Sequence, residues 1–202
     1  MVSHLADQLV DRYGYGCKTL LDPFCGSGAI LTSAQKKGIQ VVGMDINPYA
    51  TLLTRVKLEG FDSLRAFEIC EKLLRLARIS KSASPVDWVN KAYWFSDATL
   101  HKYERLRLIS HDLGLHGSRD GRAVLLAFAL SIRRCSRADQ RSPKPFISKL
   151  AQRQRRGRHF DPFTEIPCLL FQLAGLYGCP SGHRAVVVLD DVWPGLEVGP
   201  TP

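Results

Sequence analysis

The sequence predicts an α/β fold in which parallel strands alternate with helices, and three observations support it. An apolar run over 18–22 ends in an acid, Asp22, and is followed by a proline and two closely spaced glycines. Apolar residues then recur at helical spacing over 28–37. A second apolar run over 40–45 ends in another acid, Asp45. A strand, a helix and a second strand in this order begin a doubly wound sheet whose strands all end at one edge.

The periodicity of the remaining chain is mainly helical. A third strand is expected at 184–189, and it leads into Asp190 and Asp191. We therefore expect a partial sheet of about three parallel strands with a helical insertion. Further helices are expected at 3–13, after Asn47-Pro48, at 62–79, from Ser96 or Asp97 to Leu113, from Ser118 to Ile132, and from Asp161 to Tyr177.

The positive charge is concentrated in one segment. Residues 133–159 hold ten lysines and arginines and one acid, a net charge of +9 that equals the charge of the whole chain. A neutral body with one cationic segment indicates a polyanionic partner such as a nucleic acid. The alternative is a solvated loop that has no partner.

Other features narrow the class of protein. No apolar run approaches the roughly 20 residues that cross a bilayer, and the N-terminus lacks the basic and apolar segments of a secretory signal. The six cysteines never form a Cys-x-x-Cys pair, which argues against a zinc site and for reduced thiols in the cytoplasm. We expect neither a membrane nor a metal partner.

Residues 22–28, Asp-Pro-Phe-Cys-Gly-Ser-Gly, form the most specific motif of the chain. Glycines let a ligand approach the bare backbone, and an acid at the end of the next strand completes the pattern of an adenosine-ribose site. The alternative for Asp22 and Asp45 is simple capping of the strand ends. Cys25 is interpreted as a small packing residue rather than a nucleophile.

This motif resembles the S-adenosylmethionine-binding motif of the amino-group methyltransferases, which methylate exocyclic nitrogens of adenine or cytosine in DNA. Residues 44–50, Met-Asp-Ile-Asn-Pro-Tyr-Ala, match the second cofactor motif of that family. The resemblance is strongest over 19–58, and 137–149 is similar to a segment of some DNA-modifying members. It implies a Rossmann-like methyltransferase sheet in a cytoplasmic enzyme of a restriction-modification or related system.

The residue pattern along the chain, together with the resemblance, predicts a domain organisation. Residues 1–61 would be the cofactor-binding half of the Rossmann-like domain, and 62–134 the helical insertion. A basic loop would occupy 135–160. Residues 161–202 would add a return helix and the third strand of the same domain.

Specific roles follow from the resemblance for eight residues around S-adenosylmethionine. The resemblance assigns the adenine amino group to Asp191, with Asp190 as the alternative. It assigns the ribose hydroxyls to an acid because a charged acceptor makes stronger hydrogen bonds than a neutral one. The implied roles are these: Gly26 and Gly28 keep side chains off the cofactor, Ser27 offers its hydroxyl and N–H, Asp22 interacts with the methionine ammonium, Phe24 packs on the cofactor, Asp45 accepts from the ribose hydroxyls, Ile46 covers an adenine face, and Asp191 takes the adenine amino group.

DNA would be contacted by the basic segment and by an aromatic one. The aromatic cluster Trp88, Tyr93, Trp94 and Phe95 is interpreted first as core and alternatively as a surface that stacks on a flipped base. Eight basic residues are expected to contact phosphates: Arg137, Arg141, Lys144, Lys149, Arg153, Arg155, Arg156 and Arg158.

A second motif of the family is missing. Members carry an Asp, Asn or Ser followed by two prolines and an aromatic residue, and no Pro-Pro pair occurs in these 202 residues. We therefore assign no catalytic residue and expect a chain truncated before the catalytic strand. Two alternatives stay open: an RNA guanosine N2-methyltransferase and a non-catalytic nucleic-acid-binding remnant.

Overall fold

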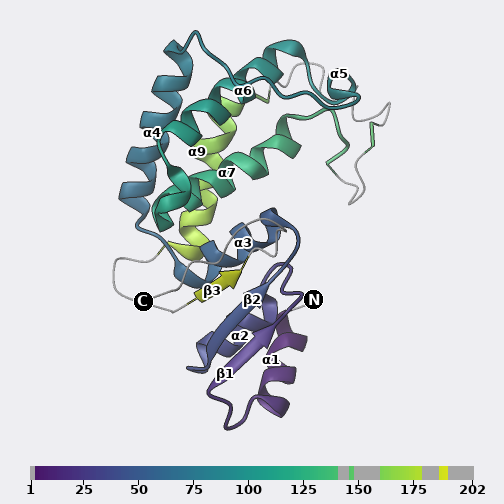
Figure 1. Cartoon of the computed structure of the whole chain (residues 1–202), viewed down its shortest axis with the longest axis vertical. Helices are drawn as coiled ribbons and strands as arrows, with labels where there is room; N and C mark the ends of the chain where they lie inside the picture. Colours follow the sequence, from purple (N-terminus) through teal and green to yellow (C-terminus); the bar gives the residue numbers. More distant parts are fainter. Residues whose placement is uncertain (1–2, 141–145, 148–159, 179–186, 191–202) are drawn as a thin grey trace. The chain divides into compact units, whose positions relative to one another are not determined.

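The computed structural model describes residues 3–140, 146–147, 160–178 and 187–190. Contacts divide the chain into two compact units (Figure 1). We call the described residues up to Gly60, together with 187–190, the sheet unit. The described residues from Phe61 to Gly178 are called the helical unit.

The sheet unit contains three parallel strands in the order β1-β2-β3. The register places Asp22 opposite Gly43, and Met44 opposite Asp190, so the carboxyl ends of the strands lie at one edge. This agrees with the α/β class predicted from the sequence. The strands are β1 (Thr19–Asp22), β2 (Gln40–Met44) and β3 (Val187–Asp190).

Three helices pack in the sheet unit: α1 (Ser3–Tyr13), α2 (Ala29–Lys36) and α3 (Pro48–Glu59). Helix α1 lies against α2, α2 lies against β1 and β2, and α3 lies beside β3 (Figure 1). Their apolar faces enclose one core of Val10, Cys25, Leu31, Ala34, Ile39, Val41 and Leu58.

Local sequence signals set the boundaries of these helices. Gly38 has φ of +76°, a left-handed conformation that suits glycine, and its N–H donates to the Gln35 carbonyl after α2 ends. Helix α3 begins where the Asn47 side chain accepts a hydrogen bond from the N–H of Tyr49 at 3.0 Å, with Pro48 in the first turn.

The helical unit is organised around α7 (Arg119–Cys135), which is buried on most of its faces and packs against α4 (Ser63–Ile79) and α9 (Pro162–Tyr177). Helix α6 (Asp97–Asp112) packs against α4, and the short 3₁₀ helix η1 (Leu115–Gly117) lies against α7. Side chains cap four of these helices at their N-termini, as the sequence predicts for three of them. The caps are Asp62, Ser96, Ser118 and Asp161.

Helix α9 differs from its expected grouping. The sequence groups this helix with the third strand, whereas its packing partners are α7 and α4, so its contacts belong to the helical unit. Its buried residues Ile166, Leu169, Leu170 and Leu173 recur at helical spacing and fill the core of that unit.

Two short elements were not predicted. Helix α5 (Lys91–Trp94) starts after Asn90, whose φ of +66° is the left-handed conformation that asparagine tolerates better than most residues. Like η1, it is too short to show an apolar period in the sequence.

Candidate functional site

The Gly-Ser-Gly turn follows directly from the end of β1. The N–H of Cys25 donates to the carbonyl of Met44 at 2.9 Å, which carries the chain across to the end of β2. Gly26 and Gly28 have φ of +52° and +71°, so both occupy the left-handed region that glycine adopts without steric cost. The turn thus depends on both glycines that the sequence motif singles out.

Asp45 is hydrogen-bonded to this turn. Its Oδ2 accepts from the N–H of Gly26 at 2.8 Å, and its Oδ1 accepts from the N–H of Asn47 at 2.8 Å. The structure therefore brings together the two motifs that lie 19 residues apart in the chain. A carboxylate has about four acceptor positions, so each oxygen of Asp45 can still accept a further hydrogen bond.

Asp22 has a local role at the end of β1. Its Oδ1 accepts from the N–H of Phe24 at 3.1 Å, which is an Asx turn that redirects the chain. The half-buried carboxylate lies in the same turn as the two glycines. Capping of the strand end, the alternative given for this residue, therefore describes part of what the side chain does.

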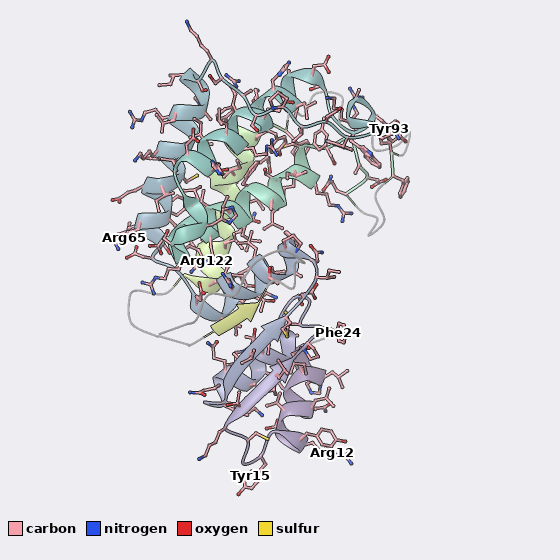
Figure 2. The ribbon with its side chains drawn as sticks, in the orientation of Figure 1. Arg12, Tyr15, Phe24, Arg65, Tyr93 and Arg122 are labelled. Atoms are coloured by element: carbon pink, nitrogen blue, oxygen red, sulfur yellow. The ribbon has the colours of Figure 1, made fainter. Side chains whose placement is uncertain are left out.

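Two large apolar side chains at this edge are exposed. Phe24, after the end of β1, is 87% exposed, and Ile46, after the end of β2, is 80% exposed. Figure 2 shows the Phe24 ring extending away from the sheet unit, with Tyr15 at the opposite end of β1. Because the side chains of Phe24 and Ile46 are exposed to water beside the glycine turn, they are available to cover the apolar surface of a ligand.

Cys25 is buried in the core of the sheet unit. Burial raises the pKa of its thiol, a hydrogen bond with Thr54 lowers it, and the charges of Asp45 and Asp22 raise it further. The net shift is upward, so the neutral thiol is favoured at physiological pH and nucleophilic chemistry is disfavoured. This agrees with the interpretation of Cys25 as a packing residue.

Helix α3 supports the turn through residues that the sequence analysis did not identify. The Thr54 hydroxyl donates to the carbonyl of Gly26 at 3.0 Å, and the Lys57 ammonium donates to the carbonyl of Ser27 at 2.8 Å. A Cβ atom at Gly28 would lie 2.6 Å from Thr54 Cγ2. The only sequence signal of Thr54 is that a polar residue lies on the buried face of α3. That signal does not say which group the hydroxyl contacts.

The basic segment is described only in part. Arg137 is exposed, and its guanidinium donates to the carbonyls of Ala92 at 2.7 Å and Tyr93 at 3.4 Å. Its N–H donates to the carbonyl of Trp94 at 2.8 Å, so the start of the segment is bonded to α5. Outside the described residues lie Asp191 and the predicted phosphate contacts Arg141, Lys144, Lys149, Arg153, Arg155, Arg156 and Arg158.

The aromatic cluster divides into buried and exposed members. Phe95 is buried and makes edge contacts with Trp88 at 6.3 Å and with Tyr103 at 5.9 Å between ring centroids. Trp88 is 41% exposed, and Tyr93, labelled in Figure 2, is 53% exposed. The core interpretation therefore describes Phe95, while Trp88 and Tyr93 leave ring surface open to a ligand.

Among the residues that the structure describes, no group of three or more His, Cys, Asp or Glu side chains is arranged to hold a metal ion. In the same part of the chain, no helix combines the length and apolarity needed to cross a membrane.

Comparisons with known proteins identify a family for this chain. A model of the D12 class N6 adenine-specific DNA methyltransferases matches residues 2–106, which include the turn, Asp45 and α3. The chain is also similar to the type II methyltransferase M.MjaII of Methanocaldococcus jannaschii, with 27% identity over 105 residues. That match covers 52% of this chain and 19% of the relative's length. No solved structure matches.

The family match covers more than half of the chain and includes both motifs that the structure joins at the end of β1 and β2. It confirms the resemblance to the DNA amino-methyltransferases. The chain belongs to the D12 class N6 adenine-specific DNA methyltransferase family.

Proposed function

We propose that the chain binds S-adenosylmethionine at the Gly-Ser-Gly turn and supplies the cofactor-binding portion of an adenine-N6 DNA methyltransferase. The hydrogen bond between the Gly26 N–H and Asp45 carries the proposal, because it joins the two motifs assigned to one cofactor. The open ends of β1 and β2 are also the edge at which parallel sheets of this kind bind ligands.

Open space beside Gly26 supports the proposal. Among the residues that the structure describes, only the carbonyl oxygen of Phe24 lies within 4 Å of a Cβ atom built at Gly26, at 4.0 Å. Ser27 is exposed beside it and offers a hydroxyl donor. When bound, the cofactor supplies a methyl group activated on a sulfonium sulfur.

Each residue of the proposed site then has a specific role in binding. Asp22 attracts the methionine ammonium, and Asp45 accepts hydrogen bonds from the ribose hydroxyls while it keeps its bond to Gly26. Phe24 and Ile46 exchange exposed surface for contact with the cofactor, including one face of the adenine. Asp191 accepts a hydrogen bond from the adenine amino group. The parallel sheet is proposed to be Rossmann-like.

DNA is proposed as the substrate on the basis of the family and the charge. The segment 133–159 neutralises phosphates, and the open rings of Trp88 and Tyr93 stack on bases. Membership of a family of DNA methyltransferases disfavours the alternative that the chain is an RNA guanosine N2-methyltransferase. The resemblance also supports a role in a restriction-modification system and a location in the cytoplasm.

No residue of the chain is proposed as catalytic. The Pro-Pro-aromatic sequence that the family uses to bind the target amine is missing from the 202 residues. We therefore expect cofactor binding without efficient methyl transfer by this chain alone. Robust transfer of a labelled methyl group to duplex DNA would contradict this part of the proposal.

Calorimetric titration with S-adenosylhomocysteine tests the cofactor assignment. Phe24→Ala is expected to weaken binding about tenfold, because a largely exposed ring contributes little to folding but loses a ligand contact. Tyr15→Ala is the matched control, since Tyr15 is a 96% exposed aromatic residue at the other end of β1. Absence of both binding heat and a thermal shift in the unsubstituted chain would reject the proposal.

DNA binding is tested separately by fluorescence anisotropy at several salt concentrations. The affinity is expected to fall steeply with salt, because several phosphates are neutralised. Tyr93→Ala is expected to reduce affinity by a further factor of about ten, and Tyr13→Ala, also an exposed tyrosine, is the control. An affinity that is independent of salt would reject the assignment of the basic segment.

A further inference from the structure

Helix α3 presents two polar side chains to the carbonyl side of the turn. Thr54 is fully buried, and its hydroxyl donates to the carbonyl of Gly26. Lys57 lies one turn further along α3, half-buried, with its ammonium on the carbonyl of Ser27.

These contacts fix two consecutive peptide groups of the turn. The carbonyls of Gly26 and Ser27 are both turned toward α3, while the N–H of Gly26 is bonded to Asp45. A peptide flip at either position would break a hydrogen bond on one or both sides. The contact is also tight, because Gly28 leaves no room for a Cβ atom against Thr54.

We infer that Thr54 and Lys57 are positioning residues that hold residues 25–28 in the shape that binds the cofactor. The inference rests on the proposed function and adds to it two residues whose polar groups contact the carbonyls of the turn. A turn that is already ordered loses less conformational entropy on binding, so the affinity for the cofactor is higher. Without the two side chains the turn would sample shapes that do not bind.

A merely structural role for α3 predicts something different. Thr51 is also buried on α3, but its hydroxyl donates to the carbonyl of Pro48 within the same helix at 3.0 Å. If only the stability of the helix mattered, loss of either hydroxyl would have a similar effect. If the turn must be held, only the loss of the Thr54 hydroxyl matters for binding.

The test uses the full chain with Thr54→Val and Thr51→Val as the matched pair. Valine keeps the shape of threonine and removes the hydrogen bond. We expect Thr54→Val to weaken S-adenosylhomocysteine binding about threefold to tenfold, Thr51→Val to leave it unchanged, and Thr54→Ser to restore it. Lys57→Met is expected to act like Thr54→Val, with the exposed Lys36→Met as its control.

Amide hydrogen exchange provides a readout that does not need the cofactor. In Thr54→Val the amides of Gly26 and Gly28 are expected to exchange about tenfold faster, while the amides of β2 keep their rates. Failure of the unsubstituted chain to bind S-adenosylhomocysteine would reject the proposed function, whereas faster exchange would still support the holding of the turn. Equal exchange and equal affinity in Thr54→Val and Thr51→Val would overturn the inference.

Discussion

The carboxylate of Asp45 and the backbone N–H of Gly26 are hydrogen-bonded at 2.8 Å, which couples the end of β2 to the turn after β1. The same carboxylate accepts from the N–H of Asn47 at the start of α3. One side chain thus joins the glycine turn to the helix that supports the turn from its other side. A substitution at Asp45 therefore affects both the folded turn and any ligand that uses the carboxylate.

Asp45→Ala is expected to lower the free energy of unfolding by about 2 kcal/mol, because two N–H groups lose a charged acceptor at a half-buried position. Asp45→Asn keeps one oxygen acceptor and is expected to lose less stability while still losing most of the S-adenosylhomocysteine affinity. Urea denaturation and calorimetry measure the two effects. Asp11→Asn, an exposed acid of α1, is the control. Equal affinity in Asp45→Asn and the unsubstituted chain would contradict the assignment of the ribose to Asp45.

Gly28→Ala is expected to destabilise the chain more than alanine at other glycines with positive φ. Gly28 and Gly38 have φ of +71° and +76°, so the backbone cost of about 1 kcal/mol is shared. Only at Gly28 would the new Cβ atom lie within 2.6–2.7 Å of Thr54, which adds about 1–3 kcal/mol of overpacking. Gly38→Ala is thus the control in urea denaturation. Equal losses in the two variants would show that Thr54 moves away without cost.

Much of the site was predictable because its signals are local. An apolar run that ends in an acid before Gly26 marks a strand and a turn, and Asn47-Pro48 marks the start of a helix. Both strands and the proximity of Asp45 to Gly26 follow from such signals and from the rule that parallel strands end at one edge.

The contacts from α3 were not predictable in the same way. Thr54 and Lys57 reach carbonyls that lie 28 and 30 residues earlier in the chain, and backbone carbonyls carry no side-chain signature. The exposure of Tyr93 was predicted only as the alternative to a place in the core. Aromatic residues are usually buried, and Tyr93 lies on the short helix α5, which has too few residues to show an apolar period that would separate its exposed from its buried positions.

Acid stability is expected to depend on Asp161. Burial raises the pKa of this carboxyl, but the hydrogen bonds from Lys102 and the Phe163 N–H, with the charge of Arg78, outweigh burial and lower the pKa overall. The unfolded chain therefore takes up the proton first as the pH falls. The stabilisation is present above the ordinary pKa of an aspartate and is lost as the pH falls through the folded-state value.

Asp161→Asn separates the charge from the helix cap, because asparagine also caps helices well. We expect a loss of about 1 kcal/mol at neutral pH, and a smaller difference from the unsubstituted chain as the pH falls below the ordinary pKa of aspartate. Urea denaturation between about pH 3 and pH 7 measures the dependence. Asp112→Asn, an exposed acid at the end of α6, is the control. A difference that stays constant with pH would contradict the role of the charge.

Alkaline stability is expected to depend on Tyr103. Its ring stacks on Phe128 with 5.6 Å between centroids, and its hydroxyl is 2.9 Å from Ser131 Oγ. Burial raises the pKa of this hydroxyl, and the neighbouring Cys135 adds to the shift. Because the unfolded chain ionises first, the stabilisation is complete below the ordinary pKa of tyrosine and is lost as the pH rises above it.

Tyr103→Phe keeps the ring and removes the hydroxyl. At neutral pH we expect it to lose about 1 kcal/mol, since Ser131 Oγ loses one of its two hydrogen-bond partners in the core and keeps only the Phe128 carbonyl. Above the ordinary pKa of tyrosine the variant should lose stability with pH less steeply than the unsubstituted chain, because one buried ionisable group is gone. Tyr13→Phe, at an exposed tyrosine, should leave the alkaline slope unchanged. Parallel alkaline unfolding curves for Tyr103→Phe and the unsubstituted chain would show that the hydroxyl of Tyr103 does not remain protonated within the fold.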